Sequence, residues 1–163
     1  MEVKSIRRYL SCRVMVDYSG QETVDRLGSQ DLNRDGAVIN LAIVGSSRFY
    51  DFEVFEGIVD DWVVRHGYPD LVIVGGASGV DYMAERWADA NILPIAVFSE
   101  EWNDPSRSLS DRGRAEAPNT LTEKILTSAS NILAMPSPTS KWTRVIIDQA
   151  SERGIPIEVN EVE

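Results

Sequence analysis

Short apolar runs alternate with amphipathic stretches along the chain from residue 39 onward. The runs predict five buried strands, at residues 39–44, 71–74, 95–98, 131–135 and 155–159. Between most of them, apolar residues recur at helical spacing, as Phe55, Val59 and Trp62 do. Such alternation is typical of a parallel sheet with helices on both faces. Right-handed crossovers then favour an α/β, doubly wound, Rossmann-like sheet with strand order 3-2-1-4-5.

Composition narrows the class of protein further. The chain has 163 residues, and its single cysteine, Cys12, excludes an internal disulfide, so we expect a cytoplasmic protein. No stretch approaches the ~20 apolar residues of a membrane span, so no membrane association is expected. The net charge of −10 makes nucleic acid an unfavourable partner.

The N-terminal part differs from the rest. We divide the chain into an N-terminal extension, residues 1–38, and a Rossmann-like domain, residues 39–163. Residues 9–18 could form a strand, whereas residues 19–37 are polar and are interpreted as a loop. The extension could add an edge strand, cover the sheet or contact a second copy of the chain in a homo-oligomer.

Doubly wound sheets bind ligands beyond the carboxyl ends of their strands. The loop after the first predicted strand contains Gly45, Ser46, Ser47 and Arg48. The glycine permits a sharp turn, the serines offer hydroxyl groups, and the arginine fork matches a phosphate or a carboxylate. The alternative is an ordinary turn with Arg48 in a surface ion pair.

The loop after the second predicted strand is rich in glycine. It contains Gly75, Gly76, Ser78, Gly79 and Asp81, and it opens a helix. Unpaired amides and the helix dipole favour an anion at such a turn. We expect Asp81 to accept hydrogen bonds from ribose hydroxyls, and the alternative is that it only caps the helix.

The loop after the fourth predicted strand carries Ser140 and Thr143 at a helix start, with Lys141 and Arg144 adding positive charge. An anion could lie there, or Ser140 could be a plain helix cap. His66 is the only histidine, so the chain offers neither a His/Cys metal set nor a Ser-His-Asp triad, and no metal is expected.

Taken together, these loops resemble the SLOG superfamily over about residues 41–159, and within it the uncharacterised branch of small bacterial and phage proteins. Gly45, Ser47 and Arg48 match its G-S-R element, and GGASGVD at 75–81 matches its G-G-x-x-G-x-D element. The resemblance implies a Rossmann-like fold that binds nucleotides or nucleotide-derived ligands at these loops.

Other parts of the family pattern match less well. Pro118 and Asn119 approximate a P-x-R-N element that lacks its arginine. Ser140 and Thr143 match an S-x-G-T element in which Trp142 replaces glycine, so the indole could block a phosphate or stack on a base. The catalytic signature of the phosphoribohydrolase relatives is missing.

Three functions follow from these residues. The chain could be a sensor, carrier or sequestering module for a nucleotide-derived small molecule, with no other cofactor expected. It could instead be an enzyme that cleaves or transfers at an N-glycosidic bond, of phosphoribohydrolase or deoxyribosyltransferase type, with Asp81 or Glu85 as the carboxylate. Single-stranded DNA binding is a third reading, which the net charge disfavours.

Overall fold

A computed structural model describes residues 20–98 and 119–162. In chain order, the helices and strands are α2 (Gly20–Leu27), β1 (Asn40–Gly45), α3 (Phe52–His66), β2 (Leu71–Val74), α4 (Val80–Ala90), β3 (Ile95–Val97), α5 (Asn119–Ser128), β4 (Asn131–Met135), α6 (Lys141–Glu152) and β5 (Ile157–Val159). Among these residues, no helix has both the length and the apolar character needed to cross a membrane.

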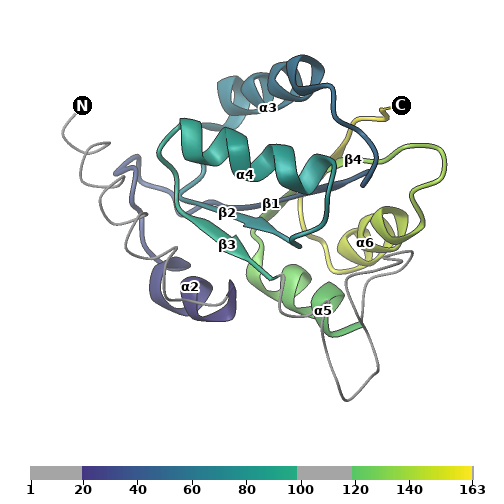
Figure 1. Ribbon diagram of the computed structural model, residues 1–163. Coiled ribbons are helices and arrows are strands. Elements are labelled where there is room, and N and C mark those ends of the chain that lie inside the picture. The colour runs from purple at the N-terminus through teal and green to yellow at the C-terminus, as the bar shows by residue number, and fades with distance from the viewer. Residues whose placement is uncertain (1–19, 99–118, 163) are drawn as a thin grey trace.

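The strands form one parallel sheet in the order β3-β2-β1-β4-β5, which confirms the predicted Rossmann-like arrangement. Figure 1 shows α3 and α4 on one face of the sheet and α2, α5 and α6 on the other. At the carboxyl edge, Gly45 of β1 lies in register with Met135 of β4. The order of the strands reverses between β1 and β4, so the loops after β1, β2 and β4 meet at one edge of the sheet.

Each face of the sheet has its own apolar core. On the α3/α4 face, Trp62 and Trp87 are almost wholly buried, as their places on apolar helix stripes predict. The Trp87 indole N–H also donates to Asp60 Oδ1 (3.1 Å), which links α4 to α3. On the other face, Phe98 and Ile125 lie in a second cluster with residues of α6. Burying both faces explains why the central strands read as continuous apolar runs.

The limits of α3 follow the local signals in the sequence. The side chain of Asp51 accepts a hydrogen bond from the Val54 N–H (3.2 Å) and caps the helix. Gly67 ends it with φ 94°, a conformation that glycine adopts without strain. His66, the last helical residue, stacks on Trp62 with ring centroids 4.4 Å apart.

The interpretation of residues 19–37 as a loop was wrong, because residues 20–27 form α2. Thr23 and Leu27 are buried, and Val24 packs against the core of the α5/α6 face. Gly20 lies so close to β3 that a Cβ there would meet the Val97 carbonyl oxygen at 2.5 Å. This part of the N-terminal extension therefore covers the sheet. Residues 9–18, which could form a strand, lie outside the described residues.

The fifth strand starts later than expected, at Ile157 rather than residue 155. Ile155 still donates its backbone N–H to Ala150 of α6 (3.0 Å), and Gly154 turns the chain with φ 73°. The helix end thus uses backbone groups that would otherwise extend the strand.

Candidate functional site

The loops after β1 and β2 are packed directly on one another. Val80 donates its N–H to the Ser46 carbonyl (2.9 Å), and Ser78 Oγ donates to the Ser47 carbonyl (2.9 Å). Gly79 has φ 70°, and a Cβ there would lie only 2.3 Å from the Ser46 oxygen. Only glycine permits this approach, and residues 45–48 and 75–81 therefore lie side by side.

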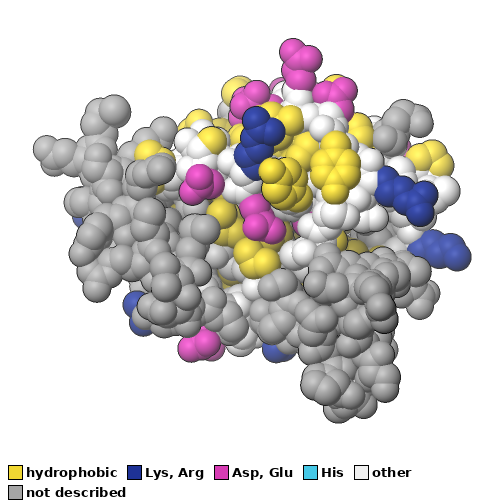
Figure 2. All heavy atoms as spheres, viewed as in Figure 1, with side chains coloured by type: hydrophobic (Ala, Val, Ile, Leu, Met, Phe, Trp, Pro, Cys, Tyr) yellow, Lys and Arg dark blue, Asp and Glu magenta, His cyan; other side chains and the backbone are white. Residues whose placement is uncertain are grey.

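Beside this junction is a pocket of about 430 Å³, lined by Tyr50, Gly76, Ala77, Ser78, Tyr82 and Glu85. The rings of Tyr50 and Tyr82 are both exposed, and their centroids lie 6.4 Å apart at an interplanar angle of 53°. Figure 2 shows hydrophobic side chains gathered on this face of the molecule among scattered charged ones. The pocket therefore combines two aromatic rings with the backbone of a glycine-rich turn.

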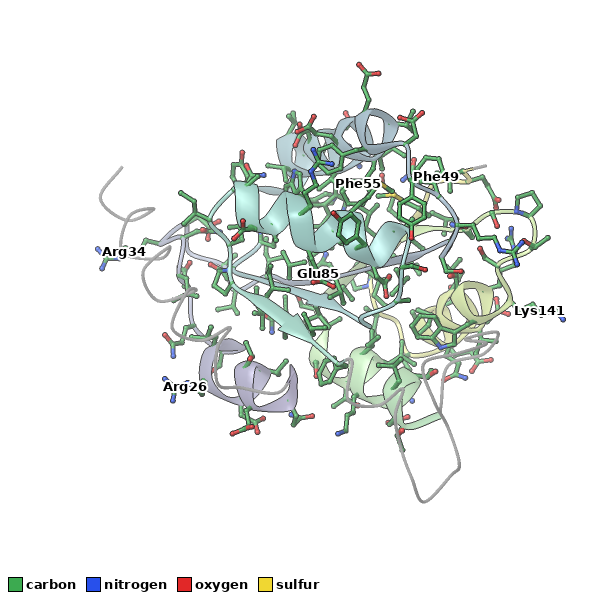
Figure 3. The ribbon with its side chains drawn as sticks, in the orientation of Figure 1. Arg26, Arg34, Phe49, Phe55, Glu85 and Lys141 are labelled. Carbon is green, nitrogen blue, oxygen red and sulfur yellow. The ribbon has the colours of Figure 1, made fainter. Side chains whose placement is uncertain are left out.

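Glu85 is the acidic residue of this pocket. It is half-buried, and Figure 3 shows it projecting from α4 toward the sheet. Burial raises the pKa of its carboxyl group, because a poorly solvated site disfavours the charged form. A carboxyl group in this state can donate a proton or a hydrogen bond more readily than one in water.

Asp81 lies one helical turn before Glu85 but in a different environment. It is 1% exposed, and its Oδ2 accepts a hydrogen bond from the Ala77 N–H (3.2 Å). The N-cap of α4 is Gly79, so Asp81 is not the cap residue. Its carboxylate instead supports the 75–77 turn from inside, and its contact with ribose hydroxyls remains a prediction.

Arg48 and Ser47 are exposed in the loop after β1, and neither is among the residues that line the pocket. The Ser46 hydroxyl is turned inward and accepts a hydrogen bond from the Arg48 N–H (3.2 Å). Within residues 20–98 and 119–162, the Arg48 guanidinium forms no ion pair. The alternative of a surface ion pair for Arg48 is therefore not seen in this part of the chain.

At the start of α6, two side chains that the sequence offers to an anion, those of Ser140 and Arg144, are already bonded within the protein. Ser140 is the N-cap residue of α6, but its Oγ accepts from the Ser137 N–H (2.9 Å) and not from an N–H of the helix. Thr143 is buried. Arg144 donates to the Ser137 carbonyl (2.8 Å) and pairs with Glu161 (3.1 Å), so its positive charge is already compensated.

Trp142, near the start of α6, lies next to the glycine-rich turn after β2. Its indole N–H donates to Thr122 Oγ1 (2.7 Å). A Cβ at Gly75 would lie 3.5 Å from Trp142 Cη2 and 3.2 Å from Asp81 Oδ2. The indole thus fills the space beside Gly75, where a glycine at position 142 would leave room.

Two residues of the expected site cannot be placed in full. Pro118 lies outside the described residues, and Asn119 is seen only as the first residue of α5. Sequence reasoning also missed Tyr50 and Tyr82. Each tyrosine directly follows a loop that carries the glycine elements and lies off the apolar helix stripes, which is the signal that could have indicated them.

Comparisons with protein-family models, with curated proteins and with solved structures find no match to this chain.

Proposed function

We propose that the chain binds a nucleotide or nucleotide-derived small molecule at the carboxyl edge of the sheet, as a sensor, carrier or sequestering module. One observation carries the proposal: the loops after β1 and β2 and the start of α4 build one pocket from two tyrosine rings and a glycine turn. Its volume of about 430 Å³ is in the range of small-molecule sites.

The parts of the site suit the parts of a nucleotide. Exposed tyrosine rings offer an apolar face to a base and a hydroxyl group to its edge. Backbone groups at Gly76–Ser78 lie just before the N-terminus of α4, where the helix dipole favours an anion. Arg48 adds a guanidinium that can bind a phosphate with two hydrogen bonds.

Glu85 supports a second candidate, an enzyme that cleaves the N-glycosidic bond of a nucleotide. Such a reaction needs an acid that protonates the leaving base, and a half-buried carboxyl group with a raised pKa is suited to that role. Asp81 suits it less, because it is buried and accepts a hydrogen bond from the turn.

The first experiment identifies the ligand without assuming it. The protein is purified natively and then denatured, and released small molecules are identified by mass spectrometry. We expect a molecule that contains a base, a ribose or a phosphate. A panel of nucleoside monophosphates is then titrated by calorimetry.

Arg48→Ala is the test of the site itself. It should weaken binding of the best nucleotide in the panel by ~1.5–3 kcal/mol, or roughly 10- to 100-fold, the scale of a charged hydrogen bond. The matched control is Arg153→Ala. Arg153 lies at the C-terminal end of α6, outside the pocket, and pairs with Glu123. If Arg48→Ala binds with unchanged affinity, or if the control loses as much affinity, this loop does not bind the phosphate.

One further assay distinguishes an enzyme from a binding module. Free base released from the same nucleotides is measured by chromatography with the unmutated protein and with Glu85→Gln. If the chain is a binding module, neither protein releases base. Release that disappears in Glu85→Gln while binding persists would establish the enzyme instead.

A further inference from the structure

The segment that joins α2 to β1 contains a pattern of oxygen-bearing side chains. It reads Asp31-x-Asn33-x-Asp35-Gly36. This is the spacing of the first half of a calcium-binding loop, in which positions 1, 3 and 5 supply side-chain oxygens and position 6 is glycine. Position 12, normally a glutamate, is here the buried Ala42 of β1. The pattern therefore points to a cation but lacks one carboxylate.

The missing carboxylate comes from another part of the chain. Asp70, directly before β2, has one carboxylate oxygen that lies within 4.8 Å of oxygens of Asp31 and Asp35, as these two do of each other. Calcium binds oxygen at 2.3–2.6 Å, so two oxygens on one calcium ion can be at most about 5 Å apart. All three carboxylates can therefore reach one ion.

Among the described residues, the negative charge of this cluster has no cationic partner. Asp70 is 0% exposed, yet in the part of the chain that the structure describes no lysine, arginine or histidine pairs with it, with Asp31 or with Asp35. A buried carboxylate beside two like charges is unfavourable unless a cation compensates it.

The carboxylate of Asp70 is held by hydrogen bonds and can still accept a metal ion. Its oxygens accept one N–H each, from Asn33 (2.8 Å) and Ile39 (2.8 Å). Because an ionised carboxylate has about four acceptor sites, lone pairs remain for a metal ion.

We propose that Asp31, Asn33, Asp35 and Asp70 form a calcium-binding site that joins the α2–β1 segment to the start of β2. The site lies at the amino ends of β1 and β2, whereas the nucleotide pocket lies at the carboxyl ends. Figure 3 shows Arg34, inside this segment, on the opposite side of the molecule from Lys141 at the start of α6. The calcium site is thus independent of the proposed function, and the bound ion stabilises the fold.

The test uses the full chain after dialysis against a calcium chelator. Calcium chloride is titrated by calorimetry, and thermal unfolding is followed with and without calcium. We expect one calcium ion per chain, and a rise of the unfolding midpoint by roughly 5–10 °C at about 100 times the Kd. Asp35→Asn keeps an oxygen that can accept the Ala37 N–H but removes a charge, and it should weaken calcium binding at least ~10-fold.

Controls make the outcome decisive. Asp148→Asn removes one exposed carboxylate on α6 and should leave calcium binding unchanged. Circular dichroism checks that each variant is folded. If Asp35→Asn does not fold, Asp31→Asn is measured in its place. Absence of binding at millimolar calcium, equal binding by the folded variant, or equal affinity for magnesium would each overturn the assignment.

Discussion

At the scale of single residues, Asp81 and Glu85 show how one helix gives two carboxyl groups different properties. Asp81 is buried and accepts a hydrogen bond from the Ala77 N–H, so its charge supports the turn. Glu85 lines the pocket, forms no hydrogen bond with another described residue, and has a pKa raised by burial. Its ionised form therefore costs stability, and Glu85 is the acid that a ligand would meet.

Glu85→Gln should stabilise the protein at pH 7. The raised pKa means that, as the pH rises, the unfolded chain loses this proton before the folded one, so the folded state loses stability from about pH 4.5 upward until the folded pKa is passed. Glutamine has no such penalty, and we expect a gain on the order of 0.5 kcal/mol at pH 7.

The measurement is urea unfolding of both proteins from pH 4 to pH 8. The advantage of Glu85→Gln should shrink as the pH falls. Glu56→Gln, at an exposed position of α3, is the control. An advantage of Glu85→Gln that does not vary with pH would contradict the assigned environment of Glu85.

At the scale of elements, the junction of the β1 and β2 loops depends on Gly79. Gly79→Ala should destabilise the fold by at least about 1–3 kcal/mol, because residue 79 has φ 70° and its Cβ would meet the Ser46 oxygen at 2.3 Å. The pocket should be lost with the junction.

Gly57→Ala is the matched comparison for that substitution. Gly57 lies within α3, and a Cβ there has no neighbour within 4 Å, so alanine should stabilise the protein by about 0.5–1 kcal/mol. Thermal unfolding of both variants checks the pair. Equal midpoints would show that the close approach at Gly79 does not exist.

At the scale of the whole molecule, an ion pair ties the edge of the sheet to a helix. Arg65 of α3 binds Glu158 of β5 through two hydrogen bonds of 2.7 and 2.8 Å. This Arg65 guanidinium lowers the pKa of the Glu158 carboxyl group. Because β5 is the short, partly exposed edge strand, the pair fixes its position against α3.

Glu158→Gln should cost about 0.5–1 kcal/mol at pH 7 and low salt, the upper range for a partly exposed pair. A lowered carboxyl pKa stabilises the fold above the unfolded value of about 4.5, and this contribution is lost as the pH falls through the folded pKa. Unfolding at several pH values should therefore show the two proteins converging in acid. A difference that grows below pH 4 would contradict this, and Glu152→Gln is the control at an exposed position.

Much of the fold could be predicted from the sequence because its signals are local. Apolar runs and helical stripes indicated the five strands and most of the helices, and α3 begins and ends at residues with local capping chemistry, Asp51 and Gly67. The order 3-2-1-4-5 then followed from general rules of chain connection. Helix α2 was missed because Val24 and Leu27 are its only large apolar residues, and packing against β3 completes it.

The sites depended on tertiary structure to a greater degree. Glycine and Arg48 marked the loops in the sequence, but the neighbouring rings of Tyr50 and Tyr82 come from separate parts of the chain. Burial alone distinguishes Glu85 from an ordinary helix carboxylate. In the same way, only the sheet brings Asp70 to Asp31. Periodicity and turn chemistry act over a few residues, so a short stretch of sequence is enough to predict their effects. Pockets and charge clusters arise where distant segments pack together, and no single stretch of the chain determines that packing.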